Sequence, residues 1–319
     1  MLMKYLLLFI SAIITGNILC AHPGVGIVSD SKGNIYYTDL AQIWMIKPDG
    51  TKSIVVPNVH THELYLDKSD RLFGEHLWYN GEEIDTWGHY FWCRYADGRI
   101  AKVKDSTAGF PQWYSFTRDD WGNMYYLEQS IPANFWKIDS TGNKTLLGSK
   151  SFSAIGRLHL TKKGKLYFSN NDDLYCIAPG DSIKLILKDI GEKGILTLVN
   201  SDRHAIMNIW SDSKENIYIA TGNVIKMIDS KKVVTAIYKS ATGWNPVSGL
   251  VTSNGDFWVL ENNAGNEVRV NKISMDERKQ IVKEYAVWLY AIPALIIIAL
   301  LTFLNFIFKP NNKSITDSK

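Results

Sequence analysis

One octet occurs almost unchanged at two distant places in the chain. Residues 29–36 read SDSKGNIY and residues 211–218 read SDSKENIY, so that Glu215 stands where the first copy has Gly33. Six segments align on this octet: SDSKGNIYYTD (29–39), LDKSDRLFGEH (66–76), RDDWGNMYYLE (118–128), LTKKGKLYFSN (160–170), SDSKENIYIAT (211–221) and VTSNGDFWVLE (251–261). A polar turn before an alternating apolar run is typical of a β-hairpin. The repeat therefore predicts six equivalent hairpins.

Each copy is followed by a second apolar stretch, which suggests a second hairpin. After the first copy, residues 42–56 read QIWMIKPDGTKSIVV, with the turn signal Pro-Asp-Gly at 48–50. The unit is therefore four strands, and the copies are spaced by roughly 37 to 52 residues, as propeller blades are. Six such sheets packed around an axis bury the apolar surface that one sheet would expose. We therefore predict an all-β fold, a six-bladed β-propeller.

Two other architectures compete with this one. A pair of two-sheet sandwiches would not require six equivalent repeats. A seven-bladed ring would need another copy, for which only residues 189–204 offer room, and no hairpin pattern is found there. The predicted blades cover residues 22–56, 60–104, 111–147, 155–188, 204–239 and 246–282.

The two ends of the predicted propeller leave no strand to spare. We expect the chain to begin on an innermost strand (25–30) and to end on an outermost strand (277–282). No strand from one terminus would then complete a blade at the other. Ring closure is expected to depend on side-chain packing between blades 6 and 1, unless the N-terminal residues pair elsewhere.

The sequence outside the repeats indicates export and anchoring. Residues 1–21 have a lone Lys4, an apolar run and a weaker TGNILCA stretch, the order of a signal peptide. Residues 285–308 carry no formal charge and are long enough to cross a bilayer as a helix. Residues 309–319 would form a short cytoplasmic tail. We expect a single-pass membrane protein with its propeller on the extracytoplasmic side, periplasmic or extracellular.

Charge and cysteine content exclude some classes of function. Lys and Arg number 35 against 32 Asp and Glu, so no basic excess favours nucleic acid. Cys93 and Cys176 align at equivalent third-strand positions, where free buried thiols are expected, and sequence alone cannot pair them. The chain has no phosphate loop, no CxxC pair and no G-x-S-x-G elbow.

The recurring pattern Asp-x-x-Gly-x-apolar-aromatic resembles that of NHL-repeat and gluconolactonase-like six-bladed propellers. The resemblance covers residues 21 to about 282 and implies the fold. The metal-site motifs of the gluconolactonase group are not visible, so the activity of that group is not carried over.

Propeller topology predicts where polar side chains gather. The second strand of each blade should end at the top face, six places past the Gly33 position. The residues there are Asp39, His76, Glu128, Asn170, Thr221 and Glu261. The oxygen-bearing members would suit Ca²⁺, and His76 with His60 or His62 would suit a transition metal such as Zn²⁺. Asp39, His76, Glu128, Asn170 and Glu261 are therefore the candidate metal ligands.

A second ring is expected where the inner strands begin, four places before the Asp30 position. Its members are Gly26, Glu63, Ser115, Arg157, Asn208 and Ser248, with Glu75 close by in sequence. Blade 2 also has a long excursion (76–92) that combines Trp78, Tyr79 and Trp87 with carboxylates and His89. Over the top face these aromatics would suit a sugar ring, a cation or a peptide. The alternative is an extended hairpin whose aromatics pack on the blade. The candidate ligand-binding residues are Glu63, Glu75, His76, Trp78, Tyr79, Trp87, Arg157 and Asn208.

Three functions remain open. We favour an anchored propeller that binds a ligand or protein partner on its top face. The alternative is a metal-dependent hydrolase of lactone or ester type on the same face, and the third possibility is a purely structural module. If strand 277–282 ends near the top rim, the membrane segment that follows would hold this face near the bilayer. Its target would then be a membrane-proximal protein, lipid headgroup or small molecule.

Overall fold

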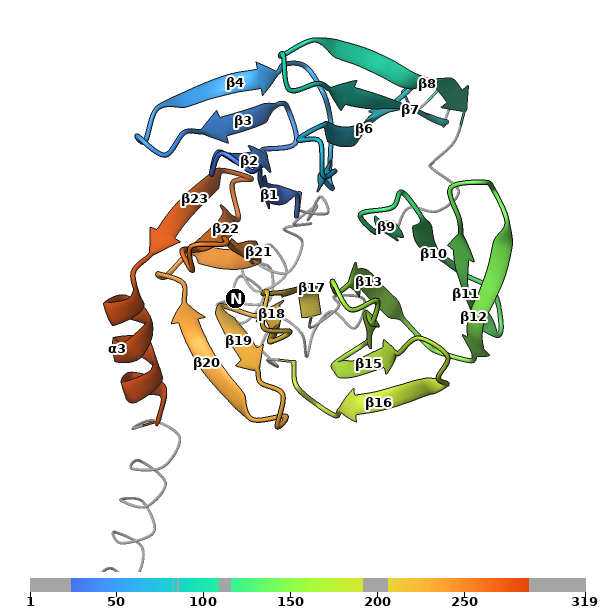
Figure 1. Ribbon diagram of the computed structural model, residues 1–319. Coiled ribbons are helices and arrows are strands. Elements are labelled where there is room, and N and C mark those ends of the chain that lie inside the picture. The colour runs from blue at the N-terminus through green and yellow to red at the C-terminus, as the bar shows by residue number, and fades with distance from the viewer. Residues whose placement is uncertain (1–23, 82, 85, 109–115, 192–205, 287–319) are drawn as a thin grey trace, which may run out of the picture.

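The computed structural model describes residues 24–81, 83–84, 86–108, 116–191 and 206–286. Six antiparallel sheets stand around a central axis, each built from strands that are consecutive in the chain (Figure 1). The predicted all-β six-bladed propeller is confirmed. In every blade the first strand lies nearest the axis and later strands lie progressively farther out.

The blades have the following strands. Blade 1 has β1 (Ile27–Ser29), β2 (Ile35–Thr38), β3 (Ile43–Ile46) and β4 (Lys52–Val56); blade 2 has β5 (Tyr65–Leu66), β6 (Leu72–Tyr79), β7 (Trp87–Arg94) and β8 (Ile100–Ala108). Blade 3 has β9 (Phe116–Arg118), β10 (Met124–Glu128), β11 (Ala133–Ile138) and β12 (Lys144–Lys150); blade 4 has β13 (Ile155–Leu160), β14 (Leu166–Asn170), β15 (Asp173–Ile177) and β16 (Ile183–Leu187). Blade 5 has β17 (Ile206–Ser211), β18 (Ile217–Thr221), β19 (Val224–Ile228) and β20 (Val234–Lys239); blade 6 has β21 (Trp244–Val251), β22 (Phe257–Asn263) and β23 (Val268–Ile273).

The repeated octet is the turn between the first two strands of a blade. In blade 1, Asp30 Oδ1 accepts hydrogen bonds from the backbone N–H groups of Lys32 at 3.0 Å and Asn34 at 2.8 Å. Its Oδ2 accepts from Asn34 Nδ2 at 2.7 Å and from the Tyr36 hydroxyl at 3.0 Å. One carboxylate therefore fixes the turn backbone and ties it to the second strand. The same four contacts surround Asp119 and Asp212.

The single difference between the two octets falls where the backbone is left-handed. Gly33 has φ of 80° and Glu215 has φ of 64°. Glycine adopts this region freely, whereas a residue with a Cβ pays about 1–2 kcal/mol for it. Glu215 gains a partial compensation, because its Oε1 accepts the backbone N–H of Lys163 in blade 4 at 3.3 Å. The second copy therefore has a less favourable backbone conformation at this position, but it gains a hydrogen bond between blades 4 and 5.

We predict that Asp212→Ala destabilises the full-length chain by about 2–4 kcal/mol, because four hydrogen bonds to one carboxylate are lost together. The matched control, Tyr218→Phe, removes only the hydroxyl contact at 3.0 Å and should cost about 1 kcal/mol. Denaturant-induced unfolding measures both values. Equal destabilisation by the two substitutions would show that the carboxylate does not organise the turn.

Buried apolar clusters join five of the six pairs of neighbouring blades. They are centred on Trp92 between blades 1 and 2, on Phe168 between blades 3 and 4, on Ile219 between blades 4 and 5, on Phe257 between blades 5 and 6, and on Leu260 between blades 6 and 1. Among the residues that the structure describes, no such cluster joins blades 2 and 3.

Ring closure uses the cluster between blades 6 and 1. Val25 and Ile27 of blade 1 pack with Val247 and Leu260 of blade 6, and no strand is shared between the two sheets. The residues before β1 pair elsewhere: the backbone N–H groups of Val25 and Gly26 both donate to the carbonyl of His62, at 2.8 and 2.9 Å. Closure by side-chain packing agrees with the expectation from the sequence.

The predicted outermost strand at 277–282 is wrong. Blade 6 has three strands, and the helix α3 (Met275–Ala286) follows β23. Its start is a capping box: Ser274 Oγ accepts the backbone N–H of Glu277 at 3.1 Å, while Glu277 Oε2 accepts that of Ser274 at 2.7 Å. Ile281 and Val282 then pack on the cluster between blades 5 and 6. The chain therefore leaves blade 6 on a helix, and not on a strand that ends at the top rim.

The two cysteines behave as expected. Cys93 and Cys176 are free and buried, on β7 and β15. Burial raises the pKa of the Cys176 thiol to about 11 and that of Cys93 in the same direction, so both stay protonated at neutral pH.

Several predictions fall on parts of the chain outside the described residues. These are the signal peptide (1–21), the tail (309–319) and all but the first two residues of the membrane segment (285–308), and they stay predictions. Among the described residues, no helix combines the length and apolarity needed to cross a bilayer. Residues 192–205, most of the space considered for a seventh blade, also lie outside.

Candidate ligand-binding cavity

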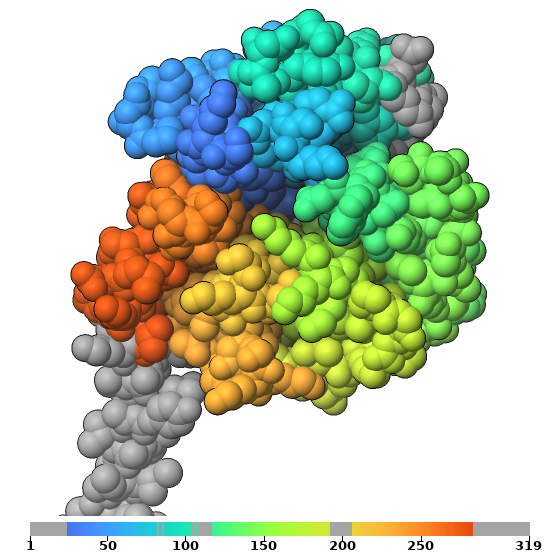
Figure 2. All heavy atoms as spheres, in the orientation of Figure 1, coloured from blue at the N-terminus to red at the C-terminus, as the bar shows by residue number. Residues whose placement is uncertain are grey.

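The inner strands of the six blades enclose a cavity of about 1610 Å³. In the space-filling view the surface is hollowed where the blades meet (Figure 2). The cavity runs from the beginnings of the inner strands, where Glu63 and Arg157 lie, to the turns at their ends. Clefts of this size that combine apolar walls with a few polar groups are the usual ligand sites of proteins.

The turn end of the cavity is formed by one repeat position. The residue directly after the turn Asp, or after the Thr that replaces it in blades 4 and 6, lines the cavity in every blade. We call this ring the turn mouth; its members are Ser31, Lys68, Asp120, Lys162, Ser213 and Ser253. Trp121, the next residue in blade 3, stands beside the mouth with 72% of its surface exposed. Only the backbone of Trp121 is needed for the turn, where its N–H donates to Asp119.

At the other end of the cavity, an ion pair connects blades that are not neighbours. The Arg157 guanidinium of blade 4 donates to Glu63 Oε1 of blade 2. The pair therefore passes in front of the inner strand of blade 3. Asn208 Nδ2 donates to Ser248 Oγ at 2.8 Å, which links blades 5 and 6 at the same level.

Burial sets the protonation of the two glutamates. Glu75 is 5% exposed and accepts the backbone N–H of His62 at 2.6 Å, with His62 Nδ1 3.6 Å from the same oxygen. Burial raises the pKa of Glu75 to about 7, and the backbone hydrogen bonds oppose the shift only in part. Burial also raises the pKa of Glu63 to about 7, against the lowering effect of Arg157. Both carboxyl groups are therefore partly protonated at neutral pH.

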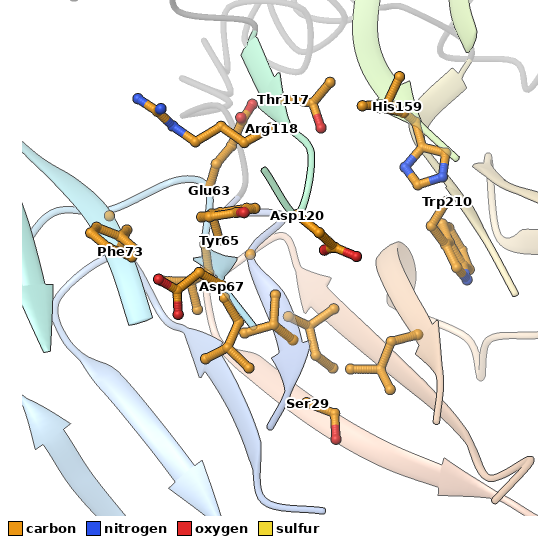
Figure 3. Close-up of a pocket in the computed structure, with 18 of the residues that line it drawn as sticks. Ser29, Glu63, Tyr65, Asp67, Phe73, Thr117, Arg118, Asp120, His159 and Trp210 are labelled. Carbon is orange, nitrogen blue, oxygen red and sulfur yellow. The ribbon is translucent and has the colours of Figure 1, made fainter. Parts of the chain in front are cut away.

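His62 and His159 are neutral at pH 7. Burial lowers the pKa of His62 to about 4, and Arg157 adds to this effect. Burial also lowers the pKa of His159 to about 4; its Nε2 lies 2.8 Å from Ser211 Oγ of blade 5. This contact gives His159 a structural role between blades 4 and 5. His159 also lines the cavity, on the side opposite Tyr65 and Phe73 (Figure 3).

The structure places the predicted ligand-binding residues in two groups. Glu63, Glu75, Arg157 and Asn208 line the cavity. His76, Trp78, Tyr79 and Trp87 lie on the β6–β7 hairpin and are absent from its described walls. Ser115 lies outside the described residues.

The long excursion of blade 2 is an extended hairpin, the alternative considered from the sequence. Its strands β6 and β7 have eight residues each, against four to six in the second and third strands of blades 1, 3, 4 and 5. The ring of His76 lies 5.7 Å from that of Trp78, and the rings of Tyr79 and Trp87 lie 5.0 Å apart. Trp87 begins β7, so it belongs to the strand. The aromatic side chains thus pack on one another along the hairpin.

The five candidate metal ligands are not brought together. Each is used within its own blade or beside it: Asp39 Oδ2 accepts the Trp44 indole N–H at 2.6 Å, and Glu128 Oε2 accepts that of Trp136 at 2.8 Å. The other three do likewise: His76 Nδ1 accepts the His60 N–H at 2.9 Å, Asn170 Oδ1 accepts the N–H groups of Ser153 and Ala154 at 3.1 Å, and the fully buried Glu261 accepts the Tyr238 hydroxyl at 2.9 Å and Arg269 Nε at 2.6 Å.

A divalent metal, which the gluconolactonase-like fold implies, does not fit these residues. In the described part of the chain, no three or more His, Cys, Asp or Glu side chains are grouped so that they could hold a metal ion. The physical reason is position: the second strand lies one strand away from the axis, so its last side chain meets the third strand instead of the cavity.

Sequence reasoning missed several residues of the cavity. Arg118 on β9, Tyr65 on β5 and the residues of the turn mouth all line it. A signal was available for the turn mouth, because its members share one register in the six aligned copies. The candidate residues predicted from the sequence lie instead at the ends of the second strands and at the starts of the inner strands.

Six blades around a central cavity give this chain the fold of gluconolactonase-like and NHL propellers. No protein-family model matches the sequence, and no curated protein matches it. Solved structures do. A gluconolactonase from Xanthomonas campestris is similar with a TM-score of 0.54 at 10% identity, over 79% of this chain and 87% of that one.

Two further structures are similar over most of their length. A luciferin-regenerating enzyme has a TM-score of 0.50 at 12% identity, over 77% of this chain and 85% of that one. Virginiamycin B lyase from Staphylococcus aureus has a TM-score of 0.43 at 13% identity, over 80% of this chain and 86% of that one. Likeness at these identities shows the fold alone.

We predict that Glu75 makes stability fall as the pH rises. Its pKa in the folded chain, about 7, lies above the ordinary value of 4.5, so the folded state binds more protons than the unfolded state between these values. The free-energy cost of burying the ionised Glu75 carboxylate is absent at low pH and fully present above pH 7. It amounts to about 3 kcal/mol for a shift of this size. Glu75→Gln should flatten the decline of the unfolding free energy between pH 5 and pH 8.

The control is Glu128→Gln. This exposed carboxylate has a pKa below its usual value because Trp136 and Asn134 donate to it, so it titrates at lower pH. The substitution should leave the slope between pH 5 and pH 8 unchanged. A Glu75→Gln chain with the slope of the original chain would refute the assignment.

Proposed function

We propose that the protein binds a small anionic molecule in the central cavity. The observation that carries this proposal is the set of cationic side chains that line the cavity. Arg118 and Arg157 lie in the walls, and Lys68 and Lys162 stand in the turn mouth.

Most of the acidic residues around the cavity accept hydrogen bonds from the turns of the blades. Asp30, Asp67 and Asp212 each accept two backbone N–H groups of their own turns. Asp70 accepts both the backbone N–H and the hydroxyl of Ser31, at 2.9 and 2.5 Å. These carboxylates keep their negative charge, but part of their oxygen lone pairs is already used within the fold.

The remaining acidic groups in the wall are Asp120, in the turn mouth, and two buried glutamates at the other end of the cavity. Glu63 and Glu75 have a pKa of about 7 because of burial. Protonation of Glu63 removes the negative partner of Arg157 and leaves the guanidinium to an incoming carboxylate or phosphate. Guanidinium groups bind such anions through two parallel hydrogen bonds. Anion binding and proton uptake by the glutamates should therefore favour each other.

A second candidate is a hydrolase that opens a lactone or ester. Carboxyl groups with a pKa near 7 can act as general acid or base at neutral pH, and the cavity holds two of them. The similar propeller from Xanthomonas campestris is described as a gluconolactonase. In this alternative Glu75 would accept a proton from the attacking water, and Arg157 would stabilise the oxyanion that develops. The residues of this chain, without a metal, carry both roles.

We predict that phosphate or gluconate binds the full-length chain and that glucose does not, as measured by calorimetry at pH 6 and pH 8. Affinity should be higher at pH 6, where Glu63 and Glu75 are protonated. Arg157→Gln should weaken binding about tenfold or more, because a charge-assisted hydrogen bond is lost. Arg99→Gln is the control: Arg99 stacks on Tyr95 and is exposed, outside the described walls of the cavity.

The same assay separates the two candidates. Opening of δ-gluconolactone above its spontaneous rate, lost in Glu75→Gln, would favour the hydrolase. Binding without turnover would favour the binding protein. Failure of every anion to bind, with no turnover, would rule out both.

We further propose that the cavity lies outside the cytoplasm, close to a membrane. The support is the sequence of residues 1–21 and 285–308, and a membrane-proximal small molecule or protein partner would follow from it. The full-length chain should stay in the membrane fraction after a high-pH wash, and a chain ending at Glu284 should be released. Release of both chains would remove the anchor from the proposal.

A further inference from the structure

The turn mouth has two unlike halves. All six of its residues line the cavity and are exposed, so their side chains can be reached from the solvent. Blades 5, 6 and 1 contribute only serines, whereas the consecutive blades 2, 3 and 4 contribute Lys68, Asp120 and Lys162. Trp121 stands beside Asp120 in blade 3. We call these four residues the charged half of the mouth.

The fold does not require an indole at position 121. The residues at the same register in the other five blades are all polar: Lys32, Ser69, Lys163, Lys214 and Asn254. With 72% of its surface exposed, Trp121 is the most exposed aromatic side chain among the described residues. Covering an indole with the apolar face of a ligand removes its surface from water, which is favourable.

The turn of blade 3 holds the backbone of Trp121 in one place. Asp119 accepts the backbone N–H groups of Trp121 and Asn123 at 3.0 and 2.9 Å. It also accepts the hydroxyl of Tyr125 at 3.2 Å. From blade 2, the Tyr65 hydroxyl donates to the carbonyl oxygen of Asp119 at 2.9 Å. The backbone that carries the indole is therefore ordered before a ligand arrives, which lowers the entropy cost of binding.

Charged groups lie on both sides of the indole. Lys68 belongs to blade 2 and Lys162 to blade 4, the two neighbours of blade 3, and the exposed Lys163 follows Lys162. Asp120 is the only carboxylate among the six residues of the mouth, and Figure 3 shows its side chain directed into the cavity. Ammonium groups attract carboxylates, whereas an aspartate accepts hydrogen bonds from hydroxyl groups. The charged half thus suits a ligand that has an apolar face, hydroxyl groups and acidic groups.

We propose that the turn mouth binds an acidic oligosaccharide, of the class built from uronic acids. One sugar ring would lie on the Trp121 indole and donate hydrogen bonds from its hydroxyl groups to Asp120. Carboxylates of the sugar units on either side would meet the lysines of blades 2 and 4. An inorganic anion would leave both the indole and Asp120 without a partner. This inference goes beyond the proposed function, because it needs Trp121 and lies at the end of the cavity opposite Glu63 and Arg157.

The test is calorimetry of the full-length chain with trigalacturonate and with the neutral trisaccharide maltotriose. Trigalacturonate should bind and maltotriose should not. Trp121→Ala should weaken trigalacturonate about tenfold or more, because stacking is lost, and Trp121→Tyr should keep most of the affinity. Lys68→Gln and Lys162→Gln should each weaken it about threefold and reduce its dependence on salt.

Lys231→Gln is the matched control for the lysines. Lys231 is exposed on the turn between β19 and β20, outside the described walls of the cavity, and its substitution should leave the affinity unchanged. If Trp121→Ala does not fold, as judged by near-ultraviolet circular dichroism, Trp121→Ser replaces it. Blade 2 forms its own turn with a serine at this position, Ser69.

Two results would overturn the inference: no binding of trigalacturonate, or equal binding to the original chain and to the chain that lacks the indole. Equal affinity for maltotriose would overturn the acidic class of ligand. Binding of phosphate or gluconate without trigalacturonate would overturn this inference alone and leave the proposed function standing. Binding of trigalacturonate that depends on Trp121, without binding of phosphate or gluconate, would support the inference while the proposed function fails.

Discussion

The carboxylate of the turn aspartate is the interaction on which the rest of this molecule depends. It satisfies two backbone N–H groups in the turn, an asparagine amide and, from the second strand, a tyrosine hydroxyl. The turn therefore has one conformation, and the residue after the aspartate has one direction, toward the axis. The full set of contacts occurs in blades 1, 3 and 5, and Asp67 and Thr161 hold the turns of blades 2 and 4 with other contacts, so that Lys68, Asp120 and Lys162 all line one cavity. The side chain after the turn aspartate can therefore differ from blade to blade, because the aspartate itself holds the turn.

The second constraint is that a ring of sheets must bury apolar surface at every interface between blades. Five interfaces do so with their own side chains, and the interface between blades 2 and 3 leaves Phe73, Phe91 and Val103 on the wall of a cavity. Blade 2 is unusual in a second way, because its middle strands are extended and carry stacked aromatic rings. The contacts that hold blade 2 in the ring are concentrated on its blade 1 side, where Trp92 is fully buried.

Most of the fold could be predicted from the sequence, because the repeat encodes local structure. Asp, Gly and an aromatic at fixed spacing specify a hairpin wherever they occur, and six hairpins leave few arrangements. The error at 277–282 has a physical origin. A fourth strand of blade 6 was expected there, although Ser274 and Glu277 have the spacing of a capping box, which indicates the start of a helix. The candidate metal ligands failed for a different reason. Sequence register predicts that Asp39 and Glu128 are equivalent, but not that each would be used by an indole N–H of the same blade.

The cavity was predictable only in part, because its chemistry depends on contacts between distant blades. Register placed Glu63, Arg157 and Asn208 at one level, but it did not predict that Glu63 of blade 2 pairs with Arg157 of blade 4, 94 positions along the chain. Pairing changes what each group can do. An exposed glutamate would be fully charged at neutral pH and would repel an anion, whereas burial brings the pKa of Glu63 to about 7 even beside a guanidinium. In the proposed function, Glu63 takes up one proton and Arg157 binds the carboxylate of a ligand in its place. Since the similar solved structures share the fold alone, this exchange between Glu63 and an incoming anion, more than any likeness, is the basis for a binding function.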